Sequence, residues 1–173
     1  MMQSSPFNLR RAILWIGRLV LGGIFVYAGY AKLFLPNFIP WPLFALSFSL
    51  STNLSNFAVQ VESYKLLSAG GVSFVAHTLP FAEIILGLLL LIGWQLRIWA
   101  SLITLIMLGF LGVVSRAYLL HMDINCGCFA TPEPLTGMTV VRDGALVALA
   151  LLMTIFAFLE ARKSHPWSAP EKA

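Results

Sequence analysis

The sequence predicts an all-α membrane protein, a four-transmembrane-helix bundle with a short extracytoplasmic interfacial helix. Of its 173 residues, 59% are hydrophobic and only 10% are charged, whereas soluble domains usually carry about 25% charged residues. The apolar residues are gathered in four runs, and a helix of about 20 residues is enough to cross a hydrocarbon core of about 30 Å. The composition therefore indicates a chain that has the bilayer as its main solvent.

The four runs are expected to be helices rather than barrel strands. Lipid offers no partner for backbone N–H and C=O groups, so a span must be a helix or part of a closed barrel. Barrel strands alternate apolar and polar residues, but these runs are continuously apolar. We expect one domain over residues 1–163 and a polar tail over residues 164–173. The expected spans are residues 12–35, 72–94, 98–120 and 139–159.

The first run follows Arg10 and Arg11, as the apolar core of a signal peptide would. Its apolar stretch is much longer than a typical signal-peptide core, and no convincing small-residue cleavage site follows it. We therefore expect an uncleaved span.

A second kind of helix is predicted between the first two spans. That segment opens with three prolines, which exclude regular helix there. Leu54, Phe57, Val61 and Tyr64 then recur at steps of three and four, which is the spacing of one helical face. We expect a helix over residues 54–68, lying on the outer membrane face or over the bundle.

The basic residues predict the orientation of the spans. Cytoplasmic loops carry an excess of Lys and Arg, and if the spans alternate, the side that holds both termini has the denser set. We therefore expect an inner (plasma) membrane protein with both termini in the cytoplasm and the loop of residues 121–138 on the periplasmic side. The denser set is Arg10, Arg11, Arg97, Arg162, Lys163 and Lys172.

The net charge of +4 does not indicate a nucleic acid partner. The sequence has no basic cluster with interleaved aromatic residues and no Gly-rich phosphate loop. The expected surroundings of the basic residues are the lipid bilayer and its interfaces.

The most informative motif is Cys126-Gly-Cys128, which holds the only two cysteines of the chain. The expected topology places it in an oxidising compartment, where disulfides persist. Gly127 supplies the backbone freedom that a bridge between these cysteines would need. So small a ring stabilises the fold little, whereas a strained and exposed disulfide tends to be reactive. The pair is therefore a candidate for thiol–disulfide exchange.

Four basic residues are candidates for activating these thiols. Lys32, Arg116 and Arg142 lie near the outer ends of their helices, with His121 close in sequence, and a positive group near a thiol lowers its pKa. The alternative is that they only reach toward the membrane interface.

A metal site is a rival interpretation of the same loop. His121, Asp123, Cys126 and Cys128 offer four ligand types that zinc accepts. However, the single-residue spacer between the cysteines departs from the usual spacing of zinc ligands, and the sequence has no second Cys pair. We expect no metal, and a purely structural role of the cysteines also stays open.

Two charges are expected inside the bilayer, where ionisable residues are costly and are functional candidates by default. Glu83 would lie about 16 Å from the outer end of its span, and Arg18 about 10 Å from the inner end of the first span. These depths approach each other, so we expect a Glu83–Arg18 ion pair. It would fix the helix register, provide a proton route or contact a quinone head group.

Several of these residues carry a resemblance to a known family. Cys-Gly-Cys-Phe at residues 126–129, in the loop before the last span, resembles the MauE/DoxX-like family of redox-associated membrane proteins. The stretch 28–33 of the first span and the Arg142-Asp143 pair that opens the last span are similar to other motifs of that family. The resemblance covers roughly residues 10–160. Two departures are Ala130, where the family commonly has Gly, and a longer loop before the short helix.

The resemblance implies a membrane protein linked to the maturation of methylamine dehydrogenase, whose small subunit is rich in disulfides, or a more general role in extracytoplasmic thiol redox. Cys126 and Cys128 would exchange with an extracytoplasmic thiol/disulfide protein or with the maturing dehydrogenase subunit. If the protein is a net oxidant, a membrane quinone is the natural electron acceptor. The alternative is a non-enzymatic membrane subunit or a small-solute permease in which Cys-Gly-Cys is a structural clip.

Overall fold

Five helices make up the described part of the chain, which is residues 6–34, 50–127 and 133–163 of a computed structural model. Four of these helices contain stretches that are long and apolar enough to span a membrane, so the predicted all-α fold with four spans is confirmed. The polar tail, residues 164–173, lies outside the described residues. The helices are α1 (Pro6–Phe34), α2 (Leu50–Ser63), α3 (Ala69–Ile92), α4 (Leu96–Leu119) and α5 (Gly137–Lys163).

The short helix α2 lies earlier in the chain than the predicted segment 54–68. Its first turn is anchored because the Asn53 side chain donates a hydrogen bond of 2.8 Å to the carbonyl oxygen of Leu33, at the end of α1. It ends before Lys65, whose φ of 52° lies in the left-handed region and does not continue an α-helix. The hydrophobic spacing located the helix, but these two local effects set its ends.

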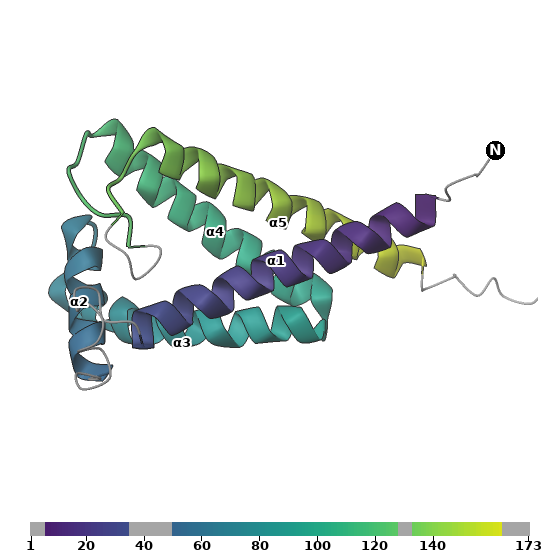
Figure 1. The fold of residues 1–173 in the computed structure, drawn as a ribbon, viewed down its shortest axis with the longest axis horizontal. Helices are drawn as coiled ribbons and strands as arrows, with labels where there is room; N and C mark the ends of the chain where they lie inside the picture. The colour runs from purple at the N-terminus through teal and green to yellow at the C-terminus, as the bar shows by residue number, and fades with distance from the viewer. Residues whose placement is uncertain (1–5, 35–49, 128–132, 164–173) are drawn as a thin grey trace, which may run out of the picture.

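The four long helices form two pairs that diverge toward one end of the molecule (Figure 1). One pair is α1 with α3, and the other is α4 with α5. The tight turn between α3 and α4 lies at the same end as the start of α1 and the end of α5, which we call the terminal end. At the opposite end, which we call the loop end, α2 lies across the bundle beside the loop that precedes α5. The spans therefore alternate in direction, as predicted.

The terminal half of the bundle contains a hydrophobic core. A core cluster of buried side chains from all four long helices fills this half, and the hydroxyls of Thr104 and Thr154, 2.9 Å apart, join α4 to α5. The loop half, where the two helix pairs diverge, lies outside this cluster. The cluster consists of Leu14, Leu21, Phe25, Leu86, Leu90, Ala100, Ile103, Ala150, Met153 and Ala157.

The α1 and α3 backbones approach each other closely at three glycines. A Cβ atom added at Gly87 would lie 2.8 Å from the carbonyl oxygen of Gly22 and 2.9 Å from the backbone nitrogen of Val26. A Cβ atom at Gly29 would lie 2.5 Å from the carbonyl oxygen of Pro80. Small residues at such an interface allow helix backbones to approach within the membrane, so these glycines fix the register of α1 on α3.

Gly87→Ala should therefore destabilise the bundle, because its methyl group would press on backbone atoms that cannot move aside. Overpacking typically costs about 1–3 kcal/mol. Gly109→Ala is the matched control, since nothing lies within 4 Å of a Cβ atom at that position on α4. Thermal unfolding in detergent should show a lower melting temperature for the first variant and not for the second. Equal melting temperatures would contradict the packing described here.

Candidate functional site

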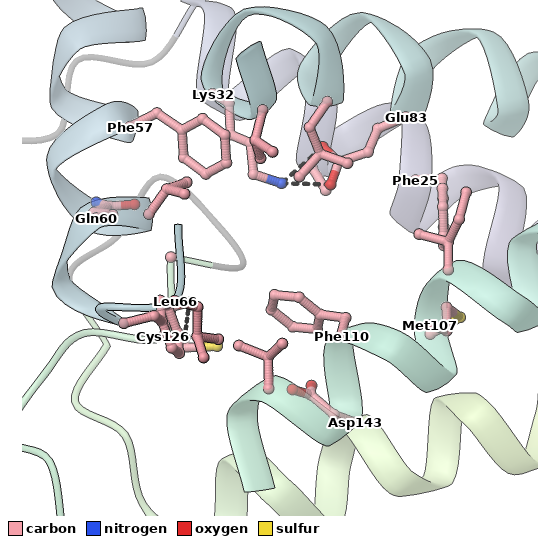
Figure 2. A pocket seen from close by; sticks show the side chains of 18 of the residues that line it. Phe25, Lys32, Phe57, Gln60, Leu66, Glu83, Met107, Phe110, Cys126 and Asp143 are labelled. Carbon is pink, nitrogen blue, oxygen red and sulfur yellow. Dashed lines mark hydrogen bonds and ion pairs between the residues drawn. The ribbon is translucent and has the colours of Figure 1, made fainter. Parts of the chain in front are cut away.

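A cavity of about 300 Å³ occupies the loop half of the bundle, where the two helix pairs diverge. All five helices and the loop before α5 contribute to its lining. Most of its walls are aliphatic or aromatic, and the few polar groups include Lys32, Glu83 and Asp143. Figure 2 shows the Lys32–Glu83 pair on one side of this space and Cys126 on another.

Cys126 lies inside the molecule rather than on its surface. Its side chain lines the cavity, and the residue is only 1% exposed. It is disulfide-bonded in the structure. Cys128 lies outside the described residues. The burial of Cys126 differs from the exposed pair that the sequence suggested, and it places the Cys126 sulfur next to a space within the bundle.

The backbone of the cysteine loop is pinned on both sides of its turn. The Cys126 N–H donates a 2.9 Å hydrogen bond to the carbonyl oxygen of Glu133, and the Leu135 N–H donates a 3.0 Å bond to that of Ile124. These bonds flank an antiparallel bridge between Asn125 and Pro134. Gly127 has a φ of 70°, a conformation that non-glycine residues rarely adopt. Cys126 is thus held in a defined backbone setting.

Tyr64 connects α2 to this loop. Its hydroxyl donates a 2.7 Å hydrogen bond to the carbonyl oxygen of Cys126. Burial, reinforced by the negative charge of Asp143, raises the pKa of the Tyr64 phenol to about 12. The phenol therefore stays protonated at neutral pH and remains a donor to the loop. Sequence spacing placed Tyr64 on the buried face of a helix, but it could not identify the hydrogen bond.

Arg142 acts on the loop from the start of α5. One of its terminal nitrogens is 2.7 Å from Glu133 Oε2, and its Nε is 3.2 Å from Asp143 Oδ1. Glu133 is also the residue whose carbonyl accepts the bond from Cys126. These contacts make Arg142 a positioning group that holds the loop through Glu133. Asp143, next to it, lines the cavity.

The other residues proposed around the thiols lie elsewhere. Arg116, His121 and Asp123 are exposed, and none of them lines the cavity. The His121 ring is directed to the carbonyl oxygen of Leu119, 3.1 Å away. Within the described ranges no three His, Cys, Asp or Glu side chains gather as metal ligands would.

The expected Glu83–Arg18 pair is wrong. Glu83 pairs with Lys32, whose ammonium lies 2.6 Å and 2.7 Å from the two carboxylate oxygens. Both side chains are largely buried, and the Phe57 ring centre lies 5.3 Å from the same ammonium. The reason is the register of α1 on α3, because Gly29 packs against Pro80 and so places Lys32, not Arg18, level with Glu83.

Arg18 instead caps the end of α3. Its Nε donates to the carbonyl oxygen of Leu90 at 3.1 Å, and a terminal nitrogen donates to that of Leu91 at 2.6 Å. The last carbonyls of a helix lack partners within the helix, so this is where a cation on a neighbouring helix is most useful. The sequence signal for the true pair was Lys32 itself, which the sequence had placed at the outer end of its span, reaching toward the membrane interface.

Comparison with known protein families identifies the family of this chain. A family model described as methylamine utilisation protein MauE matches residues 10–156. The chain belongs to this family. The match confirms the resemblance drawn from the Cys-Gly-Cys-Phe motif and its companions. Comparison with curated proteins and with solved structures gave no match.

Membership of the MauE family implies a role in methylamine utilisation. The four apolar helices make this member of the family a multi-pass membrane protein. Within that setting the cavity is the natural candidate site, because Cys126 and the buried Lys32–Glu83 pair line the same space.

The Lys32–Glu83 pair can be tested by a double-mutant cycle. Lys32→Met or Glu83→Met alone leaves one charge buried without its partner, which typically costs about 3–5 kcal/mol, whereas the double change removes both charges and should recover most of the loss. Thermal unfolding in detergent gives the coupling. Arg18→Met is the control, and its effect should add to that of Glu83→Met. Coupling between Arg18 and Glu83 instead would restore the pairing that the structure contradicts.

Proposed function

We propose that this protein is a membrane-embedded thiol–disulfide redox protein that supports disulfide formation in, or maturation of, an extracytoplasmic redox enzyme of the methylamine dehydrogenase type. The observation that carries the proposal is the disulfide-bonded Cys126, buried at a cavity inside a membrane bundle. A bridge retained only to stabilise the fold would contribute little, because the Cys-Gly-Cys spacing closes a very small ring. Membership of the MauE family supports a role in methylamine utilisation.

The burial of Cys126 suggests separate roles for the two cysteines. A folded partner cannot reach a sulfur that is 1% exposed, so the partner thiolate attacks Cys128. The disulfide then opens, Cys126 leaves as a thiolate, and Cys128 carries the mixed disulfide. The second partner thiolate attacks the partner sulfur of that bond and releases Cys128. The partner is left oxidised and the Cys126/Cys128 pair reduced.

The location follows from the charge distribution. The terminal end has the denser set of Lys and Arg, which favours a cytoplasmic position for both termini in the inner (plasma) membrane. The loop end, with α2 and the cysteine loop, would then face the periplasm. The exchange partner would be an extracytoplasmic thiol/disulfide protein or the maturing dehydrogenase subunit.

The alternative of a small-solute permease has less support. Transporter sites are typically built from discontinuous helices near the middle of the membrane, whereas the four spanning helices described here run without interruption. The core cluster also fills the terminal half of the bundle. The other alternative is a Cys-Gly-Cys bridge that only stabilises the fold, and the next experiment would reveal it.

Single cysteine variants test the exchange. Cys126→Ser keeps only Cys128, whose thiolate can attack the disulfide of an oxidised partner, which is the exchange in reverse. The mixed disulfide that forms then has no Cys126 thiolate to release it, so a heavier band should accumulate on non-reducing gels and disappear with reductant. Cys128→Ser should give little adduct, and it is the matched control. Neither variant should support maturation of the partner. A structural clip predicts similar losses of stability without a specific adduct, and full activity of the double Cys→Ser variant would end the exchange proposal.

The orientation has its own test. Because Cys126→Ser leaves one thiol, at Cys128, a membrane-impermeant thiol reagent added to intact spheroplasts after reduction should label this variant. Labelling should need no permeabilisation of the membrane, because the loop end faces outward. Protection until the membrane is opened would reverse the topology. A single Cys placed at exposed Arg97, in the turn-proximal part of α4, should show the opposite pattern.

A further inference from the structure

The cavity has the properties of a site for a flat apolar ring with polar edges. Its volume of about 300 Å³ is at the lower end of the range for small-molecule sites, which are mostly apolar with a few placed polar groups. Three aromatic side chains, Phe25, Phe57 and Phe110, are among the lining residues. Aromatic rings pack favourably against other flat rings, so the walls favour a planar ligand.

The polar groups of the cavity stand at separate positions around it (Figure 2). Lys32 is held by both carboxylate oxygens of Glu83, but an ammonium has three N–H groups. The pair can therefore offer a donor to a ligand oxygen while Glu83 keeps the ammonium in place. A fixed cation stabilises negative charge that develops on such an oxygen during a reaction. Cys126 lies across the space from this pair.

We propose that this cavity binds the ring of a membrane quinone, with one carbonyl oxygen toward Lys32 and the ring near Cys126. The proposal rests on the exchange function above and names the acceptor of its electrons. After a partner has been oxidised, the cysteine pair holds two thiols. In the reoxidation both S–H bonds break and the S–S bond forms. The two electrons and two protons pass to the quinone, whose two carbonyl groups become the hydroxyls of the quinol.

The surroundings favour a lipid-soluble acceptor over a soluble one. The cavity lies among the spanning helices, and Val75 and Leu79 of α3 and Val113 of α4 belong to its apolar lining. An acceptor such as a nicotinamide nucleotide carries phosphate charges that walls of this kind could not solvate. α3 and α4 diverge from their shared turn (Figure 1), and both helices line the cavity within the spanning part of the bundle.

Quinone reduction by the full-length protein tests the proposal. The protein, reduced and placed in lipid nanodiscs without oxygen, is mixed with decylubiquinone, and the ultraviolet absorbance of the quinone is followed together with free thiols. Quinol and disulfide should form in equal amounts. Val75→Trp, which fills the cavity, should slow the reaction about tenfold or more, which corresponds to ~1.4 kcal/mol of barrier. Phe74→Trp is the matched control, because Phe74 is 69% exposed, and it should react like the wild type.

The ammonium is tested in the double variant Lys32→Met, Glu83→Met, which leaves no unpaired charge. It should reduce decylubiquinone about tenfold more slowly but react normally with a small water-soluble disulfide. Equal rates for Val75→Trp and Phe74→Trp would remove the quinone from this cavity. If wild type reduces no quinone while Cys126→Ser still traps a partner, the quinone proposal fails and the exchange function stands. If no adduct is trapped either, the exchange function has failed.

Discussion

The close approach of α1 to α3 is the constraint on which the rest of the structure depends. Three glycines bring the two backbones into contact along the helices, so α1 cannot slide or rotate on α3 without a clash. That register selects the partners of Arg18 and Lys32, two of the charged side chains along α1. It sets Lys32 against Glu83 and Arg18 against the free carbonyls at the end of α3. It also fixes one wall of the cavity, which is formed by the α1–α3 pair. The α4–α5 pair diverges from this wall.

The energetics of buried ion pairs argue against stability as the sole role of the Lys32–Glu83 pair. Removing a carboxylate and an ammonium from water costs several kcal/mol per ion, and apolar side chains of similar volume often stabilise a fold at least as well. Asn53, which bonds the Leu33 carbonyl beside Lys32, shows that this end of α1 is anchored by other contacts. A buried ion pair whose cation borders a cavity is more readily explained by a ligand that uses the charge.

The sequence predicted those parts of the structure that depend on local patterns. Continuous apolar runs identified the four spans, and the Leu54–Phe57–Val61–Tyr64 spacing identified the short helix. The missing parts depend on contacts between distant segments. The Tyr64 hydroxyl meets the Cys126 carbonyl across 62 positions of the chain, and no periodicity encodes that pairing. Glu83 was predicted to be an intramembrane charge. Its partner depends on the register of α1 on α3, which cannot be obtained by counting residues from the ends of the spans.

The asymmetry of the bundle limits the kind of chemistry it can perform. Side chains of the core cluster close the terminal half, while the loop half holds the cavity, Cys126 and the buried ion pair. A solute carrier needs access from both sides in turn, whereas the cavity with Lys32, Glu83 and Asp143 lies in the half nearest the cysteine loop. The proposed thiol oxidation has no such requirement, because a lipid-soluble carrier can take its electrons into the bilayer. In this proposal the packed half is the rigid base that holds α1 and α3 in register beside the site of thiol oxidation.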